Sequence, residues 1–249
     1  MYAVFIEPNW IEVTHHKVGA RNDADAMKAL HLSDLHLSDI GYRERRVLEL
    51  SKELQPDVVV LSGDIVEAPS ELPALDKFLS SLAGGIKVAV LGNWEHWGDV
   101  DLEALRQIYA ARGVDLLVNE VKAYRLRNDR TLTVVGMDDF TAGKPDARVL
   151  HEIKSGNSAT LLLQHSPGWF DHPEVRGFTK KFSLCLSGHT HGGQVALFGY
   201  PFWIPRGSGG YVAGMYETSS CPLYVSRGVG SSILPIRFGA RPEIAILEL

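Results

Sequence analysis

The chain has 249 residues, of which 22% are charged, and its formal net charge is -5. That length suffices for one sizeable core, so we expect residues 1–249 to form a single domain. An acidic chain offers no basic face for a phosphate backbone, which argues against non-specific nucleic-acid binding. A phosphorylated substrate remains open, because bound metal ions can supply the positive charge.

Targeting signals and cysteines give expectations about location. No apolar stretch reaches the ~18 residues of a membrane helix, and the first residues lack the pattern of a signal peptide. As given, the chain is therefore expected in the cytoplasm. Cys185 and Cys221 are too few for a disulfide framework, and Cys185 lies in an apolar run. We expect two buried free thiols in a reducing compartment.

The first half of the chain alternates strand-like and helical patterns. Apolar, partly β-branched runs that end in polar residues predict strands within residues 27–36, 56–64 and 86–96. Apolar residues at helical spacing predict helices within residues 42–55, 71–82 and 100–112. Strands that alternate with helices predict a largely parallel, buried sheet.

The second half changes character and predicts mostly strands. Strand-like runs occupy residues 122–126, 131–136, 159–165, 181–189, 221–228 and 242–249. We therefore expect an α/β protein in which a second sheet packs on the first. Residues 198–216 are rich in aromatic residues, glycine and proline, and predict an ordered long loop. That loop either covers the core or contacts an acyl chain or a membrane surface.

Residues that can bind metals follow five of the strand-like runs. They are Asp34, His36, Asp64, Asn93, His165, His189 and His191. Taken singly, each has an ordinary explanation as a helix cap, a turn residue or a partly buried histidine. Their recurrence favours one common site, because the carboxyl ends of strands in open α/β sheets converge on one crevice.

The stretch SGHTHGGQV, residues 187–195, gives the strongest single signal. Alternate residues of an extended segment share a face, so His189 and His191 point the same way. The neighbouring glycines allow a close approach of the backbone to a metal or ligand.

The whole set, with two carboxylates, one amide and four imidazoles, exceeds one tetrahedral zinc site. It suits two divalent transition-metal ions, Mn, Fe or Zn, with one carboxylate shared between them.

The order DLH, GD, GN, H and GHTH between Asp34 and His191 resembles the calcineurin-like metallophosphoesterases. The longer stretch SGHTHGGQV, with YVSRGVG and RPEI downstream, is similar to a bacterial branch with YkuE- and YaeI-like phosphohydrolases and UDP-2,3-diacylglucosamine pyrophosphatase-type enzymes. The resemblance implies a four-layer α/β/β/α sandwich of two mixed sheets flanked by helices.

The resemblance also implies a role for each ligand. Asp34, His36 and His191 would hold one ion, and Asn93, His165 and His189 would hold the other. Asp64 would bridge the two ions, and a hydroxide between them would attack phosphorus in line. Asp64 and Asn93 would thereby belong to the catalytic machinery.

One position departs from the pattern of this family. The family reads Gly-Asn-His-Asp/Glu, with the histidine helping to protonate the leaving group, whereas this chain has Trp94 after Asn93. Either His96, displaced by two residues, supplies the proton, or the substrate has a leaving group that needs little help. Trp94 is then an apolar or stacking wall.

These observations favour hydrolysis of a phosphodiester or pyrophosphate bond, in an envelope lipid or nucleotide-sugar precursor. A phosphomonoesterase is the second hypothesis, and Trp94 argues against it. A metal-binding regulatory protein with little turnover is the alternative from another class. The partner expected in each enzymatic case is a phosphorylated small molecule or lipid, with peripheral membrane contact as a further expectation.

Overall fold

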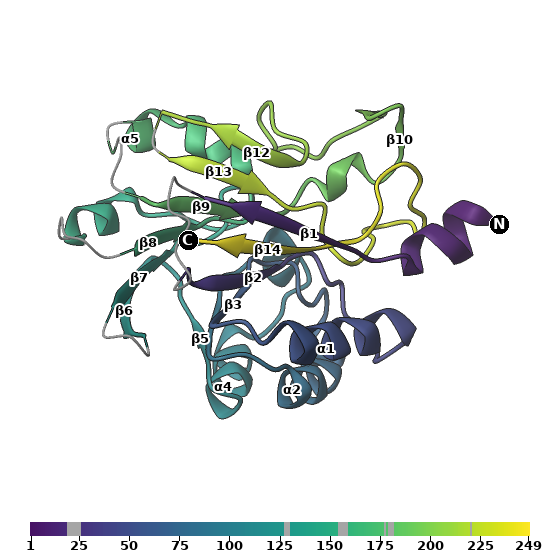
Figure 1. The fold of residues 1–249 in the computed structure, drawn as a ribbon, viewed down its shortest axis with the longest axis horizontal. Helices are drawn as coiled ribbons and strands as arrows, with labels where there is room; N and C mark the ends of the chain where they lie inside the picture. Colours follow the sequence, from purple (N-terminus) through teal and green to yellow (C-terminus); the bar gives the residue numbers. More distant parts are fainter. Residues whose placement is uncertain (19–25, 127–129, 154–158, 177, 179–181, 220) are drawn as a thin grey trace.

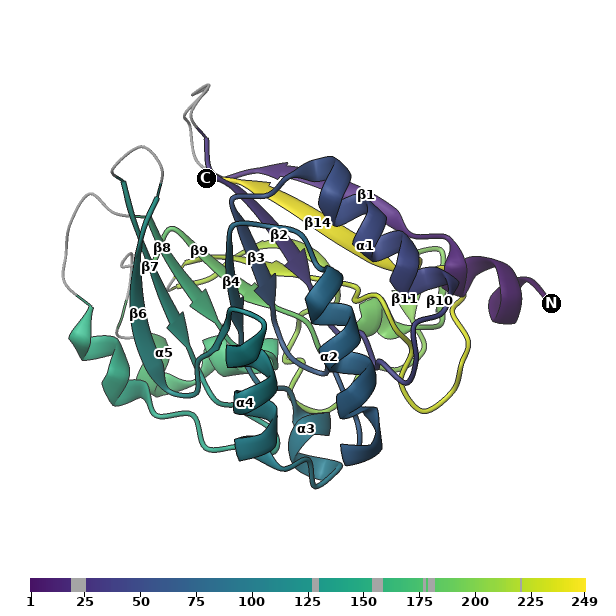
Figure 2. The same cartoon turned by 90° about the horizontal axis from the view of Figure 1, so that it is seen from below.

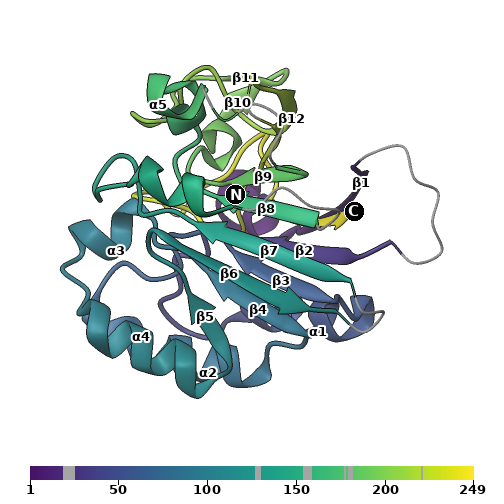
Figure 3. The same cartoon turned by 90° about the vertical axis from the view of Figure 1, so that its left-hand side faces the viewer.

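The computed structural model describes residues 1–18, 26–126, 130–153, 159–176, 178, 182–219 and 221–249. Two six-stranded sheets lie face to face, and helices cover the outer face of each sheet (Figure 1). Figure 3 shows the order of these layers, with α1, α2 and α4 on one side and α5 on the other. The expected four-layer α/β/β/α arrangement of two mixed sheets is confirmed.

The first sheet has the strand order β1-β14-β2-β3-β4-β5. Its strands are β1 (Glu12–Lys17), β14 (Glu243–Glu248), β2 (Lys28–Leu32), β3 (Val58–Leu61), β4 (Ile86–Ala89) and β5 (Val114–Leu116). All neighbours are parallel except β14 and β2, because the last strand of the chain inserts between β1 and β2. The helices on this sheet are α1 (Tyr42–Leu54), α2 (Leu72–Ser81) and α4 (Leu102–Ala111), seen side by side in Figure 2.

The second sheet has the order β12-β13-β9-β8-β7-β6. Its strands are β12 (Gly214–Glu217), β13 (Pro222–Val225), β9 (Leu184–Ser187), β8 (Ala159–Leu163), β7 (Thr131–Gly136) and β6 (Glu120–Arg125). The four central strands run parallel, and the two edge strands are antiparallel to their neighbours. Its outer face is covered by α5 (Pro173–Arg176) and by 3-10 turns at Ala147–Glu152 and Pro167–Asp171, which bury Trp169 and Phe170.

Alternation along each strand explains why both faces of the sheets are apolar. In β3, Val58 and Val60 point into the layer between the sheets, whereas Val59 and Leu61 point toward the helices. This is the two-residue period of a strand, applied to a sheet that is buried on both sides. The polar residues therefore collect where the strands end.

The remaining elements are short. A hairpin of β10 (Ala196–Leu197) and β11 (Tyr200–Pro201) and the start of β12 replace part of the loop expected over residues 198–216. The helix α3 (Asn93–Trp97) occupies the polar end of the third strand-like run, whose strand β4 ends at Ala89. Strands β1 and β5 were not predicted from the sequence. Within the described residues, every helix is too short or too polar to cross a membrane.

The expectation of two free thiols is wrong. Cys185 and Cys221 form a disulfide with a Cα–Cα distance of 6.1 Å. Cys185 lies in β9, and Cys221 immediately precedes β13, the parallel neighbour of β9. The two cysteines are 36 positions apart in the sequence, and both lie in the same buried cluster. Nothing in the local sequence of either cysteine shows this pairing.

Candidate metal centre

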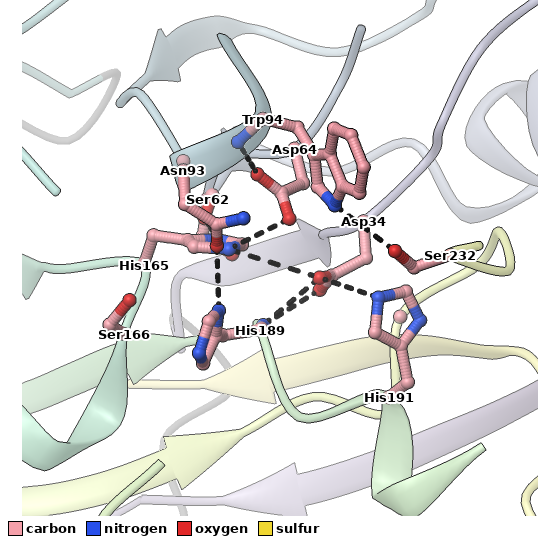
Figure 4. A network of polar contacts seen from close by, with 12 residues as sticks. Asp34, Ser62, Asp64, Asn93, Trp94, His165, Ser166, His189, His191 and Ser232 are labelled. Carbon is pink, nitrogen blue, oxygen red and sulfur yellow. Dashed lines mark hydrogen bonds and ion pairs between the residues drawn. The ribbon is translucent and has the colours of Figure 1, made fainter. Parts of the chain in front are cut away.

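All seven residues with metal-binding chemistry lie at one edge of the sandwich. Asp34, Asp64 and Asn93 follow β2, β3 and β4, which are neighbouring parallel strands of the first sheet. His165 and the pair His189 and His191 follow β8 and β9 of the second sheet. The seven side chains are buried, and most of them face one another across the gap between the sheets (Figure 4).

The cluster divides into two groups that share one carboxylate. Asp34, His36, Asp64 and His191 offer atoms that all lie within 4.8 Å of one another, and Asp64, His165 and His189 form a second such group. His36 Nε2 lies 3.2 Å from His191 Nε2, and His191 Nε2 lies 3.3 Å from Asp34 Oδ1.

Asn93 joins the second group, because its Oδ1 lies 2.8 Å from His189 Nδ1. The division matches the two ligand sets that the family resemblance implies, with Asp64 in the bridging position.

The protonation pattern around His165 fits a cation in this gap. Its Nδ1 donates to the carbonyl of Ser62 at 2.7 Å, so Nε2 is the nitrogen that faces the carboxylates. That Nε2 is buried without a hydrogen-bond partner and lies 3.1 Å from Asp64 Oδ2 and 4.0 Å from Asp34 Oδ1. Burial opposes protonation of His165, but the two carboxylates outweigh it and raise its pKa. Acceptors that face one another in this way need a positive charge between them.

The ligands stand on strained backbone. Left-handed φ angles between 46° and 73° occur at Asp34, His36, Asp64, His189 and His191. Such angles are uncommon for residues other than glycine and are found where the surrounding structure holds a functional site in place.

Glycines admit the close approaches, as expected from the sequence. A Cβ on Gly188 would lie 2.3 Å from Asp34 Oδ2, and a Cβ on Gly92 would lie 2.2 Å from Asp64 Oδ1.

Two carboxylates that the sequence did not reveal, Glu67 and Glu95, support the turns that follow β2 and β3. Glu67 Oε1 lies 2.5 Å from His36 Nδ1, which orients the ring so that Nε2 faces the cluster. Glu95 accepts from the backbone N–H groups of Asp64, Ile65 and Gly92 at 3.1, 2.6 and 2.8 Å. Burial, with the charge of Asp64, raises the pKa of Glu95 to about 7. Its place three residues after Gly92, where a capping glutamate is typical, was the available signal.

Two further groups hold the histidines of the GHTH segment. His189 Nε2 donates to the carbonyl of Arg206 at 2.7 Å, which leaves Nδ1 facing Asn93. The fully buried Arg237 donates to the carbonyl oxygens of Gly230 and Ala240 at 2.7 and 2.8 Å. Its Nη2 lies 3.3 Å from His191 Nδ1. The carboxyl-terminal part of the chain is thus tied to the ligand loop, which no local pattern indicated.

A cavity of about 590 Å³ opens onto the cluster. Its floor includes Asp64, Asn93, His189 and His191. Its walls are largely apolar and include Trp94, Trp97, Phe202, Trp203, Ile233 and Leu234. A phosphoryl group at the floor would therefore lie beneath a mostly hydrocarbon entrance.

Trp94 occupies the cavity wall in a fixed orientation. Its indole Nε1 donates to Ser232 Oγ at 3.0 Å, and its ring meets those of His36 and Trp97 edge to face. Its backbone N–H donates to Asp64 Oδ1 at 2.8 Å. The side chain therefore acts as an apolar wall beside the first group of ligands, as the sequence suggested.

His96 belongs to α3, but its side chain is engaged by a carboxylate outside the cavity lining. Its Nε2 lies 2.8 Å from Asp138 Oδ1, and this contact raises the pKa of His96. His96 is not among the described residues that line the cavity. Its role as a displaced proton donor stays a prediction.

Comparison with known proteins agrees with this geometry. Residues 27–193 match the family model described as calcineurin-like phosphoesterase. The chain is 31% identical to the uncharacterized metallophosphoesterase YkuE of Bacillus subtilis over 261 residues, covering 100% of this chain and 88% of that protein. It is 32% identical to phosphodiesterase YaeI of Escherichia coli over 257 residues, covering 100% and 92%.

A solved structure has a similar fold. The dimetal phosphatase from Danio rerio superposes with a TM-score of 0.51 at 12% identity, covering 89% of this chain and 98% of that one. That identity supports the fold alone. Together with the family match over residues 27–193, the buried cluster able to hold metal ions makes this chain a metal-dependent phosphoester hydrolase. The protein belongs to the calcineurin-like metallophosphoesterases.

Proposed function

We propose that the protein hydrolyses a phosphodiester or pyrophosphate bond rather than a phosphomonoester with a poor leaving group. The observation that carries this proposal is Trp94. An indole bonded to Ser232 and packed against His36 cannot donate a proton to a leaving group in the way an imidazole can. An enzyme without that acid favours substrates whose leaving group departs as a stable anion, such as a phosphate ester or a nucleoside phosphate.

Each half of the cluster has a distinct part in this reaction. Asp34, His36 and His191 would hold one divalent ion, Asn93, His165 and His189 would hold the other, and Asp64 would contact both. When bound, the two ions supply positive charge for the phosphoryl oxygens and lower the pKa of a water molecule. The chain itself fixes the ligands through Glu67, Ser62 and the carbonyl of Arg206.

The cavity walls exclude bulk water and position the substrate. Trp94, Trp97 and Phe202 leave room for an organic group next to the phosphoryl group. The relative YaeI, at 32% identity, carries the name phosphodiesterase, which is in line with this bond type. A lipid or nucleotide-sugar precursor of the cell envelope is the substrate class we propose.

The test compares leaving groups in the manganese-loaded protein. We expect measurable hydrolysis of bis(p-nitrophenyl) phosphate and of a UDP-sugar, and little hydrolysis of glycerol 1-phosphate. Replacement Trp94→His should raise the rate on glycerol 1-phosphate by ~10²-fold, because a placed acid contributes 10²–10⁴-fold. Trp97→His, in the same cavity, is the matched control and should give no such gain.

Two results would overturn the proposal. Equal wild-type rates on glycerol 1-phosphate and bis(p-nitrophenyl) phosphate would show that no acid is missing. An absence of turnover on every substrate, despite two bound ions, would favour a metal-dependent binding protein.

A further inference from the structure

Large apolar side chains are exposed around the mouth of the metal cavity. We name this set the apolar collar: Leu197, Phe198, Tyr200, Phe202, Trp203, Ile233 and Leu234. Phe198 is 92% exposed and Ile233 is 77% exposed. Single exposed apolar residues are ordinary, but a cluster of them at one site marks a surface that meets another phase or partner.

The two segments of the collar form one continuous surface. Gln194 Nε2 donates to the carbonyl oxygens of Ser232 and Leu234, each at 3.1 Å. The backbone N–H of Ala196 donates to the carbonyl of Phe238 at 2.7 Å. Residues of both segments also line the same cavity. Figures 1 and 2 agree in placing the β10–β11 hairpin and the yellow carboxyl-terminal loop at the same end of the molecule.

Phe198 and Ile233 have backbone conformations that are energetically unfavourable for their residue types. Phe198 and Gly199 form the turn between β10 and β11 with φ angles of 52° and 83°. Asparagine followed by glycine is the usual pair in such a hairpin turn, because bulky residues disfavour positive φ. Ile233, a β-branched residue, also has a positive φ, of 62°. Neither side chain recovers that cost by burial within this chain.

The two segments that contain the collar have no charged side chains. No charged residue occurs from Val195 to Pro205 or from Gly228 to Ile236. Exposed phenylalanine, tyrosine and tryptophan on such a surface are typical of a protein that inserts into the boundary of headgroups and acyl chains. A phospholipid-like molecule also matches the cavity, because its phosphate would meet the polar floor and its hydrocarbon part would meet the apolar walls.

The segment that follows Trp203 of the collar is hydrogen-bonded to the histidine segment of the metal centre. The carbonyl of Arg206, three residues after Trp203, accepts from His189 Nε2. The hydroxyl of Thr190 donates to the carbonyl of Val212. The position of the collar is therefore fixed relative to the metal centre, so a surface that holds the collar also sets the distance to the reacting phosphorus.

We propose that the apolar collar docks on a lipid bilayer and presents the cavity to an amphiphilic phosphoester held in that bilayer. The substrate part rests on the proposed function, whereas the docking does not. Binding is driven by burial of apolar side chains, so it occurs on zwitterionic lipid and resists salt.

The experiment is flotation of the full chain with phosphatidylcholine vesicles in 0.5 M NaCl. We expect the wild-type protein to float, and Phe198→Asn to lower the partition coefficient about tenfold, because one large apolar side chain no longer leaves water. Asparagine tolerates the left-handed backbone, so the thermal midpoint of the variant should stay unchanged or rise. The double variant Phe198→Asn/Ile233→Asn should lower partitioning further. Leu102→Asn, which removes an exposed apolar side chain on α4, is the matched control and should float as the wild type does.

The outcomes separate docking from catalysis. Hydrolysis of bis(p-nitrophenyl) phosphate without flotation would overturn the docking and leave the proposed function standing. Flotation without hydrolysis would do the reverse. Binding that requires anionic lipid and disappears in 0.5 M NaCl would overturn the apolar mode. A dimer in sedimentation velocity that Phe198→Asn dissociates, with no vesicle binding, would assign the collar to a second copy of the chain.

Discussion

The two halves of the metal centre share Asp64 but differ in charge and in support. The first half has a second carboxylate, Asp34, and a third, Glu67, behind His36. The second half adds only the neutral Asn93 to its histidines, and backbone carbonyls of Ser62 and Arg206 hold those rings. More ligand charge strengthens the attraction for a divalent ion. We therefore expect the first half to bind its ion more tightly and the second half to exchange its ion more readily.

The largest effect is expected where the two halves meet. Asp64→Asn removes the carboxylate that both share, so we expect the metal content to fall below one ion per chain. Activity should fall by at least about 10³-fold, because the charge that stabilises the transition state is lost with the ions. Elemental analysis and hydrolysis of bis(p-nitrophenyl) phosphate measure the two quantities.

The matched control for that change is Asp76→Asn, an exposed aspartate on α2 that pairs with Arg112. It should keep both the ions and the activity. If Asp64→Asn retained two ions, the sharing of one carboxylate between the halves would be wrong.

A change confined to one half should remove one ion. His165→Ala deletes a ligand of the second half, so we expect close to one ion per chain and a loss of activity on the order of 10²-fold. His191→Ala does the same to the first half. The comparison predicts that the ion left in His165→Ala resists a chelator better than the ion left in His191→Ala. The reverse order of release would contradict the assignment of the tighter site.

Removing a residue that only orients a metal ligand should weaken metal binding less than removing the ligand itself. Glu67→Gln keeps the shape but removes the charge next to His36 Nδ1. We expect the first ion to bind about 10–100-fold more weakly and the second to be unaffected. A competition titration with a fluorescent chelator would resolve the two ions, with Glu49→Gln on the exposed face of α1 as the control. An equal loss for both ions would remove the distinction between the supports.

The smallest effect concerns acid stability behind the second half. His31 is fully buried, its Nε2 lies 2.7 Å from Ser62 Oγ, and burial lowers its pKa to about 4. Between about pH 6.5 and 4, His31 is protonated in the unfolded chain but stays neutral in the folded chain. The free energy of unfolding therefore decreases as pH falls from about 6.5 toward 4. From pH 7 to pH 5.5 this amounts to on the order of 1 kcal/mol.

Urea unfolding of the metal-free wild type and of His31→Gln measures that term by difference, since the other histidines are common to both. The variant should show a flatter pH dependence over this range. An unchanged slope would mean that His31 accepts its proton in the folded protein.

The clustering of the candidate ligands could be predicted because these residues obey a rule that is local in sequence. Each follows an apolar run, and the carboxyl ends of parallel strands meet at one edge. That rule brought Asp34, Asp64 and Asn93 together without any knowledge of the loops. The packing of a second sheet on the first followed from the strand-like runs of the second half, whereas the four-layer order was implied by the family resemblance.

The rest depends on contacts between segments far apart in the sequence. Glu67 reaches His36 from the loop after β3, and Arg237 reaches the GHTH segment from the far end of the chain. The disulfide between Cys185 and Cys221 follows from the pairing of β9 with β13. A pattern within one segment carries no information about contacts with distant segments. The expectation of two free thiols was wrong for this reason.

Anomalous diffraction from a crystal grown with Mn²⁺ tests the central claim most directly. We expect two peaks ~3.5–4 Å apart on either side of the Asp64 carboxylate. One should be in contact with Asp34, His36 and His191, and the other with Asn93, His165 and His189. A single peak, or two peaks that do not share Asp64, would contradict it.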